Sequence, residues 1–375
     1  MATLALGLLL SSLPRTAGAF PPERRRDYEN RSPNEYLLVP AVASLPGIGV
    51  FAGVIASGSN LADTGIDAGA TVAESIDDSD ISLRAVALQG VPTGIPHLSF
   101  DYQWADITLG NFDAYLPGRD SPNFTIPITA RFKYQFIRPT LRLWERRIVL
   151  TYGLAFFDGF DLDTSGNELP LRQHSADAAL LLDLTDDVVD PHAGVRLTFG
   201  TTLPAPRSSI FGRDAGTESQ FGNDRDIRVR NFSATLYWPA TERVVLAWSN
   251  QIFAAVGDIP AGEVVSGGSP PLRGYPEGRW RDRYGVFSGL EARYIYPLGV
   301  KLDIVLAHGV LEALQFVGFY EVGQVSPQQD HSLFEDMHQS YGVGARALFE
   351  AIVLRFDLAT SDEGLQTHLT IGHAF

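Results

Sequence analysis

The sequence contains no cysteine among its 375 residues and only two methionines. Without cysteine the chain has neither disulfides nor thiolate chemistry, so an exported fold must be stabilised by other interactions. After the N-terminus no apolar run approaches the roughly 18 residues that a transmembrane helix needs. Basic residues are also few, with 29 Lys and Arg against 44 Asp and Glu and a formal net charge of −15. Since binding of phosphate backbones needs a basic surface, this balance argues against a nucleic-acid partner.

The N-terminus has the pattern of an export signal. An apolar stretch, Ala2 to Leu13, is followed by the small residues Ala17-Gly18-Ala19, so we predict a signal peptide over 1–19. Residues 20–34 are charged and too short to fold alone, and we expect them to form a short periplasmic segment. The remaining residues, 35–375, are predicted to form a single domain.

Within 35–375, apolar and polar residues alternate in segments of about 8 to 12 residues separated by Gly, Asn, Asp and Pro, which is typical of membrane-barrel strands. We therefore expect an all-β fold, a single transmembrane antiparallel β-barrel of about 16 strands. The predicted strands lie near 36–44, 47–58, 66–75, 80–90, 97–108, 124–136, 140–156, 174–183, 193–203, 227–238, 242–256, 283–296, 313–325, 340–349, 351–360 and 365–375.

Alternation also assigns faces to these strands. In 351–360, Phe356 faces outward while Arg355 and Asp357 face inward. The same reading assigns an outward face to Tyr294, with Glu291 and Arg293 inward. In 124–136 it places Phe132, Tyr134 and Phe136 outward, with Arg131, Lys133 and Gln135 inward. A repeatedly charged second face suits a polar lumen better than a dry core. On the last strand, Leu365, Leu369, Ile371 and the terminal Phe375 share the outward face.

The second half of the chain carries an ordered series of short motifs. In order they are Leu272-Arg273-Gly274-Tyr275, Ser288-Gly289-Leu290-Glu291-Ala292-Arg293-Tyr294, Val317-Gly318-Phe319-Tyr320-Glu321-Val322-Gly323, Gly342-Val343-Gly344-Ala345-Arg346, Leu354-Arg355-Phe356-Asp357-Leu358 and Thr370-Ile371-Gly372-His373-Ala374-Phe375. This series resembles the barrel domain of the BamA/TamA superfamily of outer-membrane barrels, the bacterial surface antigen family. Upstream, Asp190-Pro191-His192-Ala193-Gly194 is similar to the same family's Asp-Pro-x-x-Gly motif.

The resemblance implies roles for particular residues. A long extracellular loop is expected to fold back into the lumen with Arg273, Gly274 and Tyr275 at its tip, where Gly274 allows a tight turn. The implied partner of Arg273 is Glu321, at a position where the family more often has Asp, and Glu291 and Asp357 are further candidate partners. Leu369, Ile371 and Phe375 resemble the C-terminal sorting strand by which such barrels are recognised for assembly.

Nothing in the sequence supports catalysis or a cofactor. No pair of His residues with a nearby Glu has zinc-site spacing, and no Gly-x-Ser-x-Gly motif is present, so we expect neither enzyme activity nor a metal. Residues 20–34 leave no space for the periplasmic POTRA modules of the resembling family. We therefore expect a POTRA-less member of that family.

Three functions stay open. The first is assistance to insertion or translocation of protein or lipid, through a weak seam where strands 36–44 and 365–375 meet. The second is a diffusion pore with a charged lumen, and the third is a structural surface-antigen barrel without transport activity. The expected partners are outer-membrane lipid and lipopolysaccharide, client proteins, and a separate periplasmic partner that replaces the missing modules.

Overall fold

The computed structural model describes residues 34–45, 49–76, 81–115, 118–123, 125–162, 168–203, 228–257, 265–267, 271–276 and 278–371. The predicted signal peptide, nearly all of the predicted periplasmic segment and Phe375 lie outside the described residues.

Strands account for almost all of the described chain. They are β1 (Glu35–Leu45), β2 (Gly49–Ser59), β3 (Asp67–Ser75), β4 (Ser82–Pro92), β5 (Leu98–Tyr115), β6 (Thr125–Leu143), β7 (Ile148–Leu162), β8 (Glu168–Asp183), β9 (Gly194–Leu203), β10 (Arg228–Thr241), β11 (Val244–Val256), β12 (Val265–Gly267), β13 (Trp280–Asp282), β14 (Tyr284–Ile304), β15 (Ala307–Ser326), β16 (His338–Phe349), β17 (Ile352–Ser361) and β18 (Gly364–Ile371). Two short 3-10 helices, η2 (Leu61–Asp63) and η3 (His331–Phe334), complete the elements. No helix of the described part is long and apolar enough to cross a membrane.

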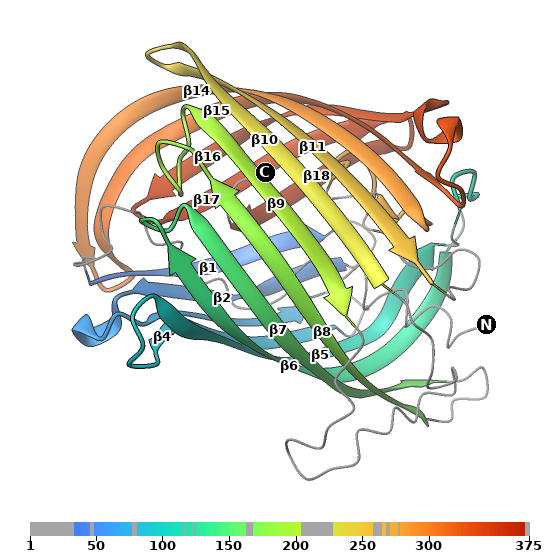
Figure 1. The fold of residues 1–375 in the computed structure, drawn as a ribbon, viewed down its shortest axis with the longest axis horizontal. Coiled ribbons are helices and arrows are strands. Elements are labelled where there is room, and N and C mark those ends of the chain that lie inside the picture. The colour runs from blue at the N-terminus through green and yellow to red at the C-terminus, as the bar shows by residue number, and fades with distance from the viewer. Residues whose placement is uncertain are drawn as a thin grey trace.

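The strands form a closed antiparallel barrel, seen from the side in Figure 1. Sixteen strands are hydrogen-bonded in chain order from β1 to β18, and β12 and β13 form a separate two-stranded sheet. Fifteen of the sixteen predicted segments each overlap one strand of the large sheet, whereas 140–156 overlaps both the end of β6 and β7. An additional pairing of β1 with β15 closes a ring of 13 strands, and β16, β17 and β18 are the three extra strands.

The closure differs from the expected pairing of the first strand with the last. β1 pairs with β15 at Tyr36↔His308 and Leu37↔Ala307. The physical reason is that the β14–β15 hairpin extends past the end of β16, whose pairing with β15 begins at Leu311↔Phe349. In Figure 1 this orange hairpin curves down the left side of the view to the blue start of β1. β1 also approaches β18 within 8 Å between Cα atoms, but no hydrogen-bonded register joins their described residues.

One predicted break inside the sheet is also wrong. The gap predicted between 124–136 and 140–156 does not occur, since β6 continues to Leu143 and the turn falls at Trp144–Arg147. Trp144, Glu145 and Arg146 all have positive φ there. Pro139 lies inside β6 because the β6–β7 register has no pairs between Ile137↔Leu154 and Thr140↔Thr151, so its missing N–H leaves no bond of that ladder unmade.

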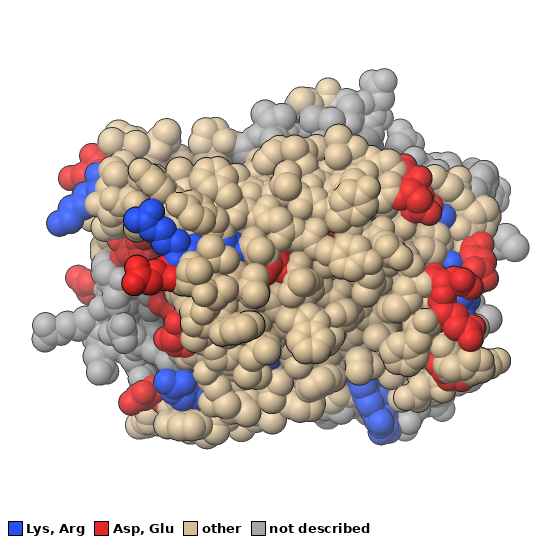
Figure 2. Space-filling view, turned by 90° about the horizontal axis from the view of Figure 1, so that it is seen from above, with Lys and Arg blue, Asp and Glu red and all other residues tan. Residues whose placement is uncertain are grey.

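The outer face of the barrel is apolar in the middle and charged at the ends. Large side chains exposed on it include Phe100, Trp238, Trp248, Leu290, Phe316, Tyr320, Val343 and Phe356. Figure 2 shows Lys, Arg, Asp and Glu gathered toward the two ends of the visible face, with an almost uncharged zone between them. The inner face, in contrast, buries many ionised side chains.

Candidate functional site

A cluster of buried charges surrounds Arg273, in the connection between β11 and β14. Its Nε donates to Glu321 Oε1 at 2.6 Å and its backbone N–H donates to Glu321 Oε2 at 2.7 Å. Its Nη1 donates to Asp357 Oδ2 at 2.9 Å, and its Nη2 lies 3.0 Å from Glu291 Oε1. The structure thus brings together the arginine and all three acids that the sequence singled out. We call these four residues the Arg273 cluster.

Strand alternation explains why three separate strands point carboxylates at one place. Glu291 lies on β14, Glu321 on β15 and Asp357 on β17, each next to a residue on the opposite face. Those neighbours, Leu290, Tyr320 and Phe356, are 50%, 45% and 44% exposed, whereas none of the three acids exceeds 2%. Because successive side chains on a strand alternate sides, an apolar outer residue fixes its charged neighbour inward.

The Arg273 side chain is also held by contacts that are not ionic. Its guanidinium carbon lies 3.4 Å from the centre of the Phe319 ring, which faces the same side of β15 as Glu321. Ser340 donates to Glu321 Oε2 at 2.8 Å. A guanidinium that is stacked on an aromatic ring and hydrogen-bonded through Nε and Nη1 has its orientation fixed.

Three further arginines complete the charge around these acids. Arg346 lies 2.6 Å and Arg293 3.0 Å from Glu291, while Arg355 Nε lies 3.1 Å from Asp357 Oδ2. With Arg273 there are four guanidinium groups to three carboxylates, so buried charge of both signs is almost balanced. Strand alternation placed Arg293 and Arg355 on the inner face, but the predicted site did not include any of the three arginines. The alternation that directs Arg293 and Arg355 inward could have identified these two.

Gly274 lies in a tight turn, as predicted, in which the Tyr275 N–H donates to the Leu272 carbonyl oxygen at 3.2 Å. Its φ is not positive, so a left-handed conformation is not what requires glycine here. Instead a Cβ at this position would lie 2.6 Å from the Thr360 carbonyl oxygen and 2.8 Å from Ser340 Cβ. The residue must therefore be glycine because the segment passes too close to β16 and β17 for any side chain.

Beyond Gly274 the chain is tied to the turn between β17 and β18. Tyr275 Oη donates to Asp362 at 2.6 Å, and Ser361 Oγ donates to the Gly274 carbonyl at 2.7 Å. Arg279 lies 2.6 Å from Glu363. The described residues 271–276 and 278–282, which we call the inner segment, are therefore fixed both to the inner face and to the last hairpin.

The outer part of the inner segment meets the β5–β6 connection. Arg279 donates to the Ser121 carbonyl at 2.9 Å, and Arg281 donates to the Tyr115 carbonyl. Trp280 stacks on His338 with ring centres 3.7 Å apart, and Arg279 lies over the other side of the indole. The inner segment thus bridges strands on opposite sides of the ring.

Burial also changes how the inner segment titrates. Burial, followed by the hydrogen bond to Asp362, raises the pKa of Tyr275, so the phenol stays a neutral donor. Burial lowers the pKa of Arg281 to about 10 and raises the pKa of Asp282. Each shift follows from the cost of holding charge away from water.

A second inward contact comes from the turn between β8 and β9, where the Asp-Pro motif lies. Val189 packs in a buried apolar cluster with residues of β11, β14, β15 and β17. Asp190 accepts from Gln315 Nε2 at 2.8 Å. This turn therefore packs into the barrel from the end opposite the inner segment.

One predicted face is inverted. Phe136 is 3% exposed and shares its face with Thr140, which donates to Asp101, whereas Arg131, Lys133 and Gln135 are exposed. The register joins Phe136 through Gln103 to Ala87, which is fully buried on the inner face. This part of β6 lies in the charged end zone of the outer face, where polar side chains also point outward. A polar residue there therefore does not indicate the inner face.

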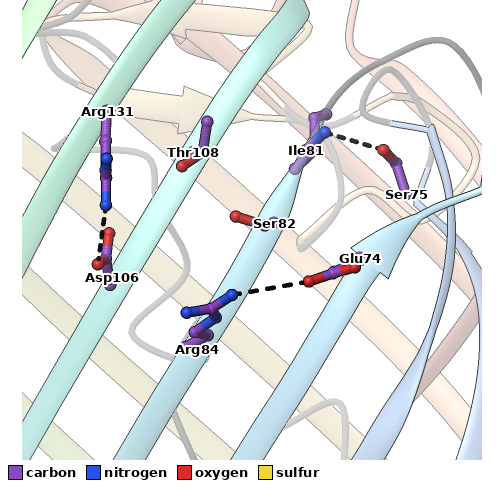
Figure 3. A pocket seen from close by; sticks show the side chains of 8 residues that line it. All are labelled: Glu74, Ser75, Ile81, Ser82, Arg84, Asp106, Thr108 and Arg131. Carbon is purple, nitrogen blue, oxygen red and sulfur yellow. Dashed lines mark hydrogen bonds and ion pairs between the residues drawn. The ribbon is translucent and has the colours of Figure 1, made fainter.

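That end zone contains an outward cavity of about 400 Å³ between β3 and β6, shown in Figure 3. Its charges pair locally, Arg84 with Glu74 at 3.7 Å and Arg131 with Asp106 at 3.5 Å. These side chains are more than half exposed except for Asp106, and they are separate from the Arg273 cluster.

The residues of the predicted sorting strand lie on β18 as far as the structure describes it. Leu369 is in register with the exposed Phe356, and Ile371 is in register with Leu354. His368, next to Leu369 and buried on the inner face, lies 2.7 Å through Nε2 from the Arg273 carbonyl oxygen.

Comparison with known proteins supports the fold. No family model matches the sequence. A search of curated proteins also finds no match. Among solved structures the chain is similar to BamA from Haemophilus ducreyi lacking POTRA domains 1–3, with a TM-score of 0.52, 12% identity, and coverage of 90% of this chain and 68% of that one.

Two further structures have the same fold. CdiB from Escherichia coli gives a TM-score of 0.57 at 14% identity, covering 90% of this chain and 61% of that one. CdiB from Acinetobacter baumannii gives 0.58 at 9% identity, covering 91% and 60%. The chain thus spans about three fifths of the length of either CdiB protein. At these identities the comparisons establish a shared barrel fold.

Proposed function

We propose that this chain is an outer-membrane barrel of the BamA/TamA type that assists the insertion or translocation of protein or lipid at the outer membrane. The observation that carries the proposal is the Arg273 cluster, in which one arginine of the inner segment meets carboxylates of β14, β15 and β17. In this proposal all 16 strands form the membrane barrel and the inner segment is an extracellular loop folded into the lumen.

The distribution of exposed side chains supports a membrane location. An uncharged zone on the outer face, with charge gathered at its ends, suits a hydrocarbon layer between two aqueous sides (Figure 2). The connections also sort by length, since β10–β11 and β16–β17 turn within two residues while the connection between β11 and β14 runs from 257 to 283. Short turns face the periplasm and long loops the exterior in barrels of this kind.

The first and last strands of the large sheet, β1 and β18, support a seam that can open. β1 and β18 approach each other without a ladder between their described residues. β1 also contains Pro40, which cannot donate a ladder hydrogen bond. A strand edge with unpaired backbone groups can template another strand, so a client protein is a fitting partner. Lipopolysaccharide and a separate periplasmic partner complete the proposed surroundings.

The filled interior favours this function over a diffusion pore. The inner segment packs from one end and the β8–β9 turn from the other, both against the same group of C-terminal strands. A steady channel for small solutes requires continuous water along the axis, and these two contacts oppose it.

The test uses the purified chain in liposomes. We expect it to speed the folding of a second outer-membrane barrel protein relative to protein-free liposomes. Folding is measured as heat-modified migration of the second protein in gels. The matched variants are Arg273→Ala, which should lose the effect, and Arg131→Ala, which should keep it. No acceleration by the unaltered chain would sink the insertion proposal. A large steady conductance in planar bilayers, unchanged in Arg273→Ala, would support the pore instead.

A further inference from the structure

We infer that the tip of the β14–β15 hairpin, residues 299–309, is a strap that holds β1 and closes the barrel ring, leaving β16, β17 and β18 outside this ring as a flap of three strands. This inference goes beyond the proposed function. It concerns which strands hold the ring together, whatever the barrel transports.

The contacts between the strap and β1 are few and local. The Leu38 N–H donates to the Leu306 carbonyl at 2.8 Å, next to the register pairs Tyr36↔His308 and Leu37↔Ala307. The rings of Tyr36 and His308 stack with centres 5.9 Å apart. β1 is thus bound to the tip of a hairpin, by a ladder that ends before the middle of the strand.

A small apolar cluster seats the strap on the turn between β16 and β17. Ala307 packs with Phe349 and Ile352, and Leu37 of β1 packs against the same cluster. Glu350 Oε1 accepts from the Val310 N–H at 2.7 Å. The strap therefore crosses the ends of the flap strands on its way to β1, as the curved orange hairpin in Figure 1 illustrates.

Two glycines produce the bend that brings the tip to β1. Gly299 and Gly309 have φ of 67° and 149°, and the β14–β15 register shifts between Pro297 and Val300. A Cβ at Gly309 would lie 2.9 Å from Phe349 Cζ and 3.0 Å from Glu350 Cγ. The sequence thus permits a sharp turn of the hairpin away from the barrel wall at this level.

The strap can also detach without opening the core. Val305 at its tip is 89% exposed, and Lys301 and Asp303 are exposed beside it. Detachment breaks the short ladder to β1, the Tyr36–His308 stack and the apolar contact of Leu37 with the cluster around Ala307. Separation of β18 from β1 then leaves the 13-strand ring closed, and release of the strap is the additional step that opens the ring.

Disulfide trapping tests the inference directly, because the natural chain has no cysteine to interfere. The strap variant carries Tyr36→Cys with His308→Cys, and the seam variant carries Tyr36→Cys with Thr370→Cys on β18. Residues of a hydrogen-bonded pair lie within bridging distance, whereas no ladder aligns the described residues of β1 and β18, so we expect roughly tenfold more cross-linked chain from the strap variant.

Both variants are made in outer membranes and scored on non-reducing gels, with heat-modified migration showing that the barrel has folded. If the strap variant fails to fold, Leu37→Cys with Ala307→Cys takes its place. Cross-linking of the seam variant in preference to both strap pairs would overturn the inference.

The glycine bend provides a second, independent measurement. Gly309→Ala in the strap variant should reduce the cross-linked fraction severalfold, because its Cβ has no space and its φ is unfavourable. Gly318→Ala is the matched control on the same strand, since a Cβ there meets nothing within 4 Å. Equal cross-linking in the two glycine variants would contradict a hinged strap. None of these measurements depends on insertion activity, so a barrel that fails to insert proteins can still confirm the strap.

Discussion

His368 of the last strand and Arg273 of the inner segment are joined directly, with the imidazole Nε2 2.7 Å from the arginine's carbonyl oxygen. Since the Arg273 side chain is bound to β14, β15 and β17, this contact connects the charge cluster to β18 as well. The inner segment therefore holds β18 from inside the barrel, and no ladder joins the described residues of β1 and β18.

Replacing His368 should loosen the last strand. His368→Leu keeps the approximate volume but removes the donor, leaving a buried carbonyl without that partner, at a cost of about 1–3 kcal/mol. Because the described part of β18, Gly364–Ile371, has a ladder to β17 alone, we expect faster hydrogen exchange in its amides and little change in β10 and β11. His368→Gln retains a donor and serves as the control. Equal protection of β18 in the leucine and glutamine variants would contradict the link.

Arg273→Ala should be strongly destabilising. The change leaves Glu291, Glu321 and Asp357 buried without their shared guanidinium, and breaking a buried ionic group in this way costs about 3–5 kcal/mol. The measurement is the urea midpoint of barrel unfolding in detergent or lipid. Arg131→Ala is the comparison, because that guanidinium is 54% exposed and an exposed ion pair contributes only about 0–1 kcal/mol. Similar midpoints for the two variants would show that the cluster does not stabilise the fold.

Gly274→Ala should release the inner segment while leaving the strands in place. The new Cβ meets the Thr360 carbonyl and Ser340, so the segment has to move away and its bonds to Asp362 and Ser361 weaken. We expect protease cleavage within 271–282 to become faster in whole cells or liposomes. Gly318→Ala should cleave at the natural rate, since its Cβ occupies open space. Cleavage at the natural rate in Gly274→Ala would mean that the segment tolerates the methyl group.

The parts of the site that sequence predicts well are those set by local alternation. The inward positions of Glu291 and Asp357 follow from the exposed Leu290 and Phe356 beside them, and the register carries this pattern across β14 to β17. The same rule of alternation gave the wrong faces for 124–136, because it was applied with the polar residues assigned to the inside. The outer face near Arg131 lies in a charged end zone, so the polar residues there point outward and Phe136 points inward.

Other features depend on contacts between distant residues and leave little trace in the sequence. The need for glycine at position 274 comes from the Thr360 carbonyl, which lies 86 residues further along the chain. The closure of β1 on β15 depends on how far the β14–β15 hairpin extends past β16, which alternation does not report. Gly299 and Gly309 were visible as glycines, but their bend became interpretable only once their φ values were known.

The bond between Tyr275 and Asp362 should make stability fall at alkaline pH. Burial and the Asp362 carboxylate raise the pKa of Tyr275, whereas a tyrosine in the unfolded chain has a pKa of about 10. The folded protein keeps a proton that the unfolded chain loses, so this contribution to the unfolding free energy is complete below about pH 10 and declines above it. The measurement compares urea midpoints at mildly and strongly alkaline pH. Tyr275→Phe has no phenol to titrate and should lose less stability over the same interval, while the other tyrosines affect both proteins alike. Parallel declines in the two proteins would show that the Tyr275 proton does not contribute to holding the inner segment.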